Sequence, residues 1–312
     1  MTGSRSLCWI LFALFVPLSV AQKKNAQDDI SLTPSVVYAG APELIRVHVS
    51  GGASNVSGEW LGHKVQFFEG KQAGDWFALA GVDVEAPIGP STLRIKVIAM
   101  PDSADFSRTV EIHAAHYRTG TLTVESKFVA PPPEVQKQIE EEIKLKAKVF
   151  ASSANVPLWQ GDFHAPVPAQ ATDSFGTRRM FNGKLASIHK GADFHAATGT
   201  PVHASNSGIV VIARPLYFEG NCVVIDHGLG LYTLSMHFSR IDVKEGQHVN
   251  TGDQLGLSGA TGRVTGPHLH WAVRWENAYL DPVKLLHLNL NLNAPEATAP
   301  KAASTHKAHK QR

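Results

Sequence analysis

Four residues in the second half of the chain have the types and spacing of a metal site. His189 and Asp193 form an H-x-x-x-D pair, and His268 and His270 form an H-x-H pair further along. Because residues two apart on a strand point to the same face, one of the later histidines can bind a metal while the other faces the same cavity. His189, Asp193 and one of that pair would give three ligands. Catalytic zinc keeps three protein ligands and an open fourth position, so the pattern predicts catalytic rather than structural zinc.

Short strands joined by glycine turns must position these side chains. From about residue 160 to residue 288, apolar runs alternate with glycines in the manner of a β-rich domain. The expected strands are 208–212, 221–226, 231–234 and 269–273. Gly191, between the first two candidate ligands, is expected to allow the close turn that points both of them at one ion.

The first half of the chain has a different pattern, which predicts an immunoglobulin-like β-sandwich accessory domain at 30–130. Short alternating runs recur between turn residues, among them 44–49, 93–97 and 110–112. Three prolines at 131–133 then end the pattern. Residues 134–150 carry apolar side chains on one stripe, with acids early and lysines late, and predict a helix within a linker at 131–159. The predicted fold class is mainly β, with the second β domain at 160–288.

Both ends of the chain are expected to lie outside the folded domains. Arg5 precedes an apolar run from Leu7 to Val20, and small residues follow up to Ala21, so residues 1–21 predict a signal peptide and export to the periplasm or the cell exterior. No later stretch is apolar for the roughly 20 residues that a spanning helix needs, so no membrane span is expected in the mature chain. Residues 289–312 are rich in Asn, Ala, Pro and Lys and predict a disordered tail.

Cysteine content and charge narrow the class of protein further. Cys8 lies inside the apolar run rather than at its end, which argues against a lipoprotein, and cleavage would leave Cys222 without an internal disulfide partner. The formal net charge of +2 falls to about +1 when the signal peptide is removed, so charge gives no case for a nucleic-acid partner. Oligomeric state stays open.

Five segments of the second half stand in one consistent order between about Phe175 and Pro282. They are His189 to Phe194, Gly199 to Val202, Ile225 to Gly228, Met236-His237, and Thr261 to His270. As a set they closely resemble the lysostaphin/LytM-type zinc metalloendopeptidases. The resemblance implies a mostly antiparallel β-sheet with a groove, and cleavage of peptide bonds in the stems or cross-bridges of bacterial peptidoglycan. It leaves open whether a D-alanyl cross-link or a glycine bridge is cut.

The resemblance also assigns the site residues. It implies that His189, Asp193 and His270 bind Zn²⁺ and that His237 and His268 are the catalytic pair. Since no glutamate lies beside the metal histidines, histidine is the natural proton carrier near neutral pH. We expect His268 to activate water and His237 to donate to the oxyanion, although these two roles could be exchanged.

Two observations bear on whether the chain is an enzyme or a related protein without catalytic activity. Where the family usually has Tyr-x-His-Leu, this chain has Ser235 to Phe238, a departure that bears on the shape of the groove and retains the histidine. Some members of the family have lost zinc ligands and activate cell-wall amidases, so a wall-binding or activator protein is the alternative to an enzyme. A general secreted endopeptidase is a third, weaker hypothesis. The complete set of expected ligands favours the enzyme.

The remaining histidines are expected to be structural or at the surface, because a chain with 16 histidines produces metal-like spacings by chance. These are His164, His195, His203, His227 and His248. Cys222 is expected to be a small buried residue rather than a nucleophile. The pair Arg178-Arg179 could meet substrate carboxylates, but a solvated edge is the more frequent role of paired arginines.

Overall fold

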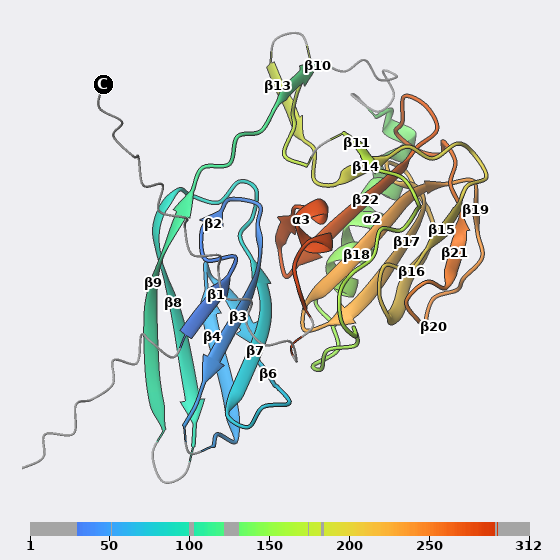
Figure 1. Ribbon diagram of the computed structural model, residues 1–312. Helices are drawn as coiled ribbons and strands as arrows, with labels where there is room; N and C mark the ends of the chain where they lie inside the picture. The colour runs from blue at the N-terminus through green and yellow to red at the C-terminus, as the bar shows by residue number, and fades with distance from the viewer. Residues whose placement is uncertain are drawn as a thin grey trace, which may run out of the picture.

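A computed structural model describes residues 30–50, 52–99, 103–121, 131–173, 175–181, 184–290 and 292. The expected signal peptide at 1–21 and nearly all of the expected tail therefore lie outside the described residues. Within them the predicted mainly β fold is confirmed: Figure 1 shows a body of strands from the first half of the chain beside a second body of strands from the other half.

The N-terminal body consists of two sheets. One has the strand order β1-β3-β7-β6 and the other β2-β9-β8-β4-β5. Their bounds are β1 (Ile30–Thr33), β2 (Val37–Tyr38), β3 (Pro42–His48), β4 (Asn55–Trp60), β5 (His63–Gln66), β6 (Phe68–Glu69), β7 (Asp75–Gly81), β8 (Gly89–Ile98) and β9 (Ala104–His113). Alternate residues of both sheets point into one core, where Ile45, Trp60 and Leu93 are fully buried. This is the expected sandwich.

The C-terminal body is built on an antiparallel sheet in the order β11-β14-β22-β18-β17-β16-β20, with β23 also paired to β22. The smaller sheets are β15-β21-β19 and β10-β12-β13. The bounds are β10 (Thr119–Thr121), β11 (Ala171–Asp173), β12 (Arg178–Phe181), β13 (Lys184–Ile188), β14 (Ala192–Phe194), β15 (Pro201–His203), β16 (Gly208–Leu216), β17 (Gly220–Gly228), β18 (Leu231–Phe238), β19 (Arg240–Ile241), β20 (His248–Val249), β21 (Gln254–Leu257), β22 (Leu269–Trp275) and β23 (Ala278–Leu280). The antiparallel sheet expected from the resemblance is confirmed.

The predicted helix is present as α2 (Pro133–Phe150), and it packs on the C-terminal sheet. Leu145, Val149 and Phe150 cover a cluster of buried residues from β16, β17, β18 and β22. The guanidinium of Arg274 lies 4.1 Å from the centre of the Phe150 ring, and the Tyr232 hydroxyl donates to the Val149 carbonyl at 3.2 Å. The C-terminal part of α2 is thus fixed to this body. Among the described residues, no helix has the length and apolar character needed to cross a bilayer.

The two bodies share a continuous apolar core and specific hydrogen bonds. The backbone N–H of Tyr279 donates to Asp83 at 2.8 Å, and that of Asp281 donates to the Gly40 carbonyl at 2.7 Å. Gly81 fits against Leu280 so closely that a Cβ at this position would lie 2.4 Å from a methyl carbon. These contacts fix the first body against β23 and the short helix α3 (Pro282–Leu286) that follows it.

Glu43 on β3 is a buried acid near this contact. Its side chain is completely buried, and neither carboxyl oxygen has a hydrogen-bond partner. Burial raises the pKa of Glu43 to about 9, although the charge of Lys284 on α3 acts in the opposite direction. The carboxyl group is therefore protonated, and neutral, in the folded protein at pH 7.

We expect Glu43→Gln to stabilise the fold at neutral pH and to have little effect at pH 4. Between about pH 4.5 and 9 the unfolded chain loses this proton while the folded chain keeps it, so the native state loses stability as pH rises. The penalty removed at pH 7 is about 3 kcal/mol, at about 1.4 kcal/mol per pKa unit. Urea unfolding of zinc-saturated protein across this pH range measures it. Glu111→Gln, at an exposed carboxyl of β9, is the matched control, and parallel pH profiles for the Glu43 variant and wild type would contradict the prediction.

Candidate metal centre and active site

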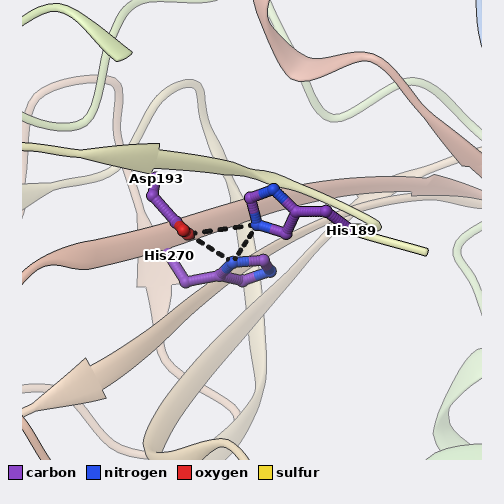
Figure 2. A group of neighbouring side chains, drawn as sticks. All are labelled: His189, Asp193 and His270. Atoms are coloured by element: carbon purple, nitrogen blue, oxygen red, sulfur yellow. Dashed lines mark hydrogen bonds and ion pairs between the residues drawn. The ribbon is translucent and has the colours of Figure 1, made fainter. Parts of the chain in front are cut away.

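Three side chains that are distant in the sequence converge on one point of the C-terminal sheet. Figure 2 shows His189, Asp193 and His270 pointing toward one another. Asp193 Oδ1 lies 2.8 Å from His270 Nδ1 and 3.2 Å from His189 Nε2, and the two ring nitrogens are 3.1 Å apart. His189 is buried, while the other two side chains keep 13–14% exposure. One side of the group is therefore open to a ligand.

The spacing of these donor atoms fits a zinc ion. Tetrahedral zinc with bonds of about 2.0–2.1 Å places its ligand atoms about 3.3 Å apart. The three separations found here are close to that value, and two imidazole nitrogens with one carboxylate oxygen are a donor set that zinc accepts. The residues therefore match the Zn²⁺ cofactor expected from the sequence.

Strand pairing explains how the site is assembled. Asp193 on β14 stands directly opposite His270 on β22, so both side chains project from the same face of the sheet. His189 follows β13 and approaches from the preceding loop. Gly191 is required here for space: a Cβ would lie 2.5 Å from His270 Nε2 and 2.8 Å from the Trp271 carbonyl oxygen. The φ of this glycine is not in the left-handed region, so close packing rather than an unusual turn explains the residue.

His268 lies two positions before His270 and faces the same side, as strand alternation predicts. Its Nδ1–H donates to the Gly266 carbonyl at 2.8 Å, which leaves Nε2 directed at the cluster, 3.7 Å from Asp193 Oδ1. The ring is 20% exposed. His268 therefore borders the three-residue group and keeps a nitrogen available on its open side.

His237 reaches the same place by a backbone conformation that a regular strand does not have. Its neighbour Met236 pairs with His270, so alternation along β18 would turn His237 to the opposite face. Its φ of 67° lies instead in the left-handed region, an uncommon conformation for a residue other than glycine. The ring centre consequently lies 5.1 Å from that of His268 and 6.0 Å from that of His270.

The hydrogen bonds of His237 fix its tautomer. Nδ1–H donates to the Thr261 carbonyl at 2.8 Å, so Nε2 of the neutral ring carries the lone pair. Burial, together with the charges of His270 and His268, lowers the pKa of His237 to about 3. The ring is therefore neutral near pH 7 and can accept a proton at Nε2.

Asp193 is held as a carboxylate. Burial acts to raise its pKa, but the hydrogen bonds to His189 and His270 outweigh burial and keep the pKa of Asp193 well below its usual range. A carboxylate oxygen is thus available to a metal over the whole physiological pH range. Burial also lowers the pKa of His270, which favours the neutral ring that metal binding requires.

An open cavity of about 480 Å³ adjoins the group. His189, His237 and His270 form part of its wall, together with residues from β12, β18 and β23. Glu85 is the single lining residue from the N-terminal body among those the structure describes, and it pairs with Lys190 at 3.1 Å. The first body therefore forms part of the rim of this cavity.

The comparisons with known proteins address the same region. Residues 187–282 match the model of peptidase family M23. The C-terminal domain belongs to peptidase family M23. All five site residues lie inside the matched segment, so the resemblance seen in the sequence is confirmed.

Two proteins named as peptidoglycan endopeptidases match part of this chain. The chain is 41% identical over 137 residues to the peptidoglycan DD-endopeptidase ShyA of Vibrio cholerae, which is 44% of this chain and 29% of ShyA. It is 40% identical over 117 residues to the DD-carboxypeptidase/endopeptidase Mpg of Neisseria meningitidis, which is 37% of this chain and 26% of Mpg. The chain thus spans less than a third of the length of these relatives.

An M23 protein of known crystal structure, from Pseudomonas aeruginosa, is similar over both bodies. It superposes with a TM-score of 0.59 at 27% identity, covering 79% of this chain and 95% of that protein. The likeness therefore extends from the M23 domain into the N-terminal sandwich.

Other residues of the M23 domain that were named from the sequence lie outside the three-residue metal group. His227 is buried, bonded to the Ser207 carbonyl and the Thr233 hydroxyl at 2.8 Å each, and burial lowers its pKa to about 4. Burial raises the pKa of Cys222, an unreactive small residue of the core. Met236, in the segment that departs from the family pattern, lines the cavity with an apolar side chain.

The sequence did not single out Thr261 and Arg263 individually. Thr261 accepts the His237 hydrogen bond, and its hydroxyl donates to the Phe238 carbonyl at 2.9 Å while accepting from the Asn221 N–H at 2.9 Å. Arg263 lines the cavity beside Phe218. Both belong to the segment before His268 that carries the family resemblance. That resemblance is the one feature of the sequence that could have pointed to them.

Proposed function

We propose that this chain is a zinc-dependent endopeptidase that cleaves peptide cross-links of bacterial peptidoglycan. The observation that carries the proposal is the convergence of three metal-binding groups and two further histidines, of which His189, His237 and His270 line one open cavity. Peptidoglycan as substrate is supported by the relatives, since ShyA and Mpg are named for DD-endopeptidase activity. A cross-link between two stems would enter the cavity as an extended peptide.

In this proposal His189, Asp193 and His270 hold the zinc ion. When bound, zinc polarises the carbonyl of the scissile amide and makes the attacking water more acidic. The residual positive charge of a site with one carboxylate ligand also suits a developing oxyanion.

The two remaining histidines then move protons. Both rings hold Nδ1 on a backbone carbonyl, which leaves Nε2 to exchange protons. One ring takes the proton of the attacking water at Nε2, and this proton is delivered to the departing amine nitrogen. With ring centres 5.1 Å apart, the two rings can pass a proton between them directly or through solvent. Because both rings make the same kind of hydrogen bond, we keep His268 as the group that activates water and His237 as the donor to the oxyanion, and the exchanged order stays open.

The complete site argues against the alternative of a wall-binding or amidase-activating protein. None of the expected ligands is missing, and the buried His237 is held in an uncommon backbone conformation that metal binding alone does not need. The wall as substrate also requires export, which the expected signal peptide at 1–21 would provide. The domain boundaries at 30–130, 131–159 and 160–288 stay predictions.

Digestion of purified peptidoglycan sacculi tests the proposal. The chain without residues 1–21 is expected to release peptide-linked fragments whose masses identify the bond that is cut. A chelator should stop the release and added zinc should restore it. If zinc-loaded, folded protein releases no fragments, the binding or activator role takes the lead, and stimulation of a cell-wall amidase would support it.

A further inference from the structure

The helix α2 makes two polar contacts with residues 217–219, the loop that joins β16 to β17. The carboxylate of Glu142 accepts from the backbone N–H of Tyr217, at 2.9 Å for Oε2 and 3.1 Å for Oε1. Lys146 Nζ lies 2.5 Å from Glu219 Oε1, and the two side chains are 25% and 14% exposed. The helix thus holds both ends of the 217–219 loop.

These two polar side chains lie on the face of α2 that packs on the C-terminal sheet. Positions 142, 145, 146 and 149 follow the spacing i, i+3, i+4, i+7, which places them on one side of a helix. Leu145 and Val149 contact the buried cluster of the sheet, so the helix is fixed at the level of Glu142 and Lys146. The loop is therefore held by a helix that is itself held by the sheet.

The same loop holds the backbone of His237. The Glu219 carbonyl accepts the His237 N–H at 3.0 Å, while the Thr261 carbonyl accepts from the ring. A left-handed φ is unfavourable for a residue with a Cβ and persists only where surrounding contacts maintain it. The Glu219 carbonyl is therefore part of what keeps the His237 ring beside the metal group.

Close packing links the loop to the second of these acceptors as well. Gly220 directly follows the loop, and a Cβ at this position would lie 2.3 Å from the Thr261 carbonyl oxygen. A Cβ at Gly262 would in turn lie 2.3 Å from the Gly220 nitrogen. Because the two backbones are in direct contact, a displacement of the loop would disturb both hydrogen bonds of His237.

The charge of Lys146 is needed because the Glu219 carboxylate is largely buried. Among the described residues, Glu219 Oε2 has no hydrogen-bond partner, so the contact of Oε1 with Lys146 is what offsets the burial of this carboxylate. Removing one partner of a buried ion pair leaves an uncompensated charge, which is strongly unfavourable. Without Lys146, the Glu219 side chain would turn further into the open cavity that it already lines, and the loop backbone would move with it.

We infer that Lys146 of α2 is a positioning residue for His237 and acts through Glu219. It fixes the loop whose carbonyl holds the His237 backbone, so the helix between the two bodies is part of the support of the active site. The inference rests on the proposed function for its effect on catalysis. The positioning itself is a property of the folded chain and can be measured without substrate.

The test compares Lys146→Met, which removes the charge, with Lys146→Arg, which keeps it. Lys144→Met, at an exposed lysine of the same helix, is the matched control. All proteins are the zinc-loaded chain without residues 1–21. Amide hydrogen exchange followed by NMR reports the protection of the His237 N–H, with Leu234 in the buried middle of β18 as internal reference. The rates on a cross-linked peptide give kcat and KM, and zinc is measured in the same samples.

In Lys146→Met we expect the His237 amide to exchange about 10-fold or more faster, the scale of one lost hydrogen bond, while Leu234 exchanges as in wild type. The kcat should fall about 10-fold, with a smaller change in KM and unchanged zinc content. Lys146→Arg should restore most of both values, and Lys144→Met should behave as wild type.

Three results would overturn the inference. These are an unchanged His237 amide in Lys146→Met, an equal acceleration of Leu234, which would indicate general loss of stability, and a wild-type kcat despite selective exposure of His237. Selective exposure of the His237 amide without cleavage by any protein, wild type included, would uphold the positioning role and contradict the endopeptidase proposal instead.

Discussion

His268→Ala and His237→Ala are each expected to lower peptide release about 100-fold or more while zinc content stays as in wild type. Neither residue belongs to the three-residue metal group, whose donor atoms lie within 4.8 Å of one another. Both rings instead fix Nδ1 on a backbone carbonyl and lie beside the metal group, with Nε2 left to exchange a proton. Loss of a proton carrier typically costs about 10²–10⁴-fold in rate. Initial rates on a cross-linked peptide, with zinc measured in the same samples, give both quantities.

The control for this pair is His195→Ala. His195 is an exposed histidine beside β14, two residues from Asp193, so its removal changes histidine content near the site without entering the cavity. The tail histidines His306 and His309 are present in every variant, so zinc is compared as a difference from wild type. Loss of zinc in both His237 and His268 variants would show that these residues hold the metal and would refute their assignment as proton carriers.

Local pattern was sufficient to predict the parts of the site that follow from strand alternation. His268 and His270 share a face because they are two apart on an extended chain, and that inference needs no tertiary information. The helix at 134–150 and the strands expected at 44–49, 93–97, 110–112, 208–212, 221–226, 231–234 and 269–273 likewise follow from short-range periodicity and turn residues. These predictions agree with α2 and with the strands of the structure.

The features that the sequence did not predict depend on contacts between distant segments. Alternation would place His237 on the wrong face, and its left-handed φ becomes interpretable only when Thr261 is seen to accept its hydrogen bond. Gly191 was expected to serve a turn, whereas the structure shows that it leaves room for the His270 ring. The buried Glu43 could not be recognised from an alternating strand, because its burial is a property of the assembled fold.

The start of the expected tail also involves a contact between residues that are distant in the sequence. Its composition predicts disorder from residue 289, but Leu290 is 4% exposed and its backbone N–H donates to Asp162 at 2.6 Å. Packing against a distant residue therefore extends the ordered chain at least to this leucine. Composition alone reports average behaviour over a segment and cannot locate such a contact.

Asp193→Ala is expected to reduce zinc affinity about 10²–10³-fold and to remove detectable peptide release at trace zinc. Structural zinc in zinc-finger peptides is bound with roughly 10–16 kcal/mol, and one ligand of three or four carries a corresponding share. Asp193 also carries the single negative charge of the group, and its Oδ1 lies within 3.2 Å of the nitrogens of both histidine ligands. The variant should therefore leave two neutral nitrogens that hold the ion weakly.

Thermal unfolding with and without zinc measures this loss independently of catalysis. Zinc at 100 times its Kd stabilises the native state by about 2.7 kcal/mol, so wild type should show a clear rise in Tm that Asp193→Ala lacks at the same zinc concentration. Asp242→Ala, which removes an exposed carboxylate paired with Arg240, is the matched control and should keep the wild-type rise. Stoichiometric zinc and an unchanged Tm response in Asp193→Ala would place the metal elsewhere. Since the expected proton carriers border this group, that result would also remove the basis for their roles.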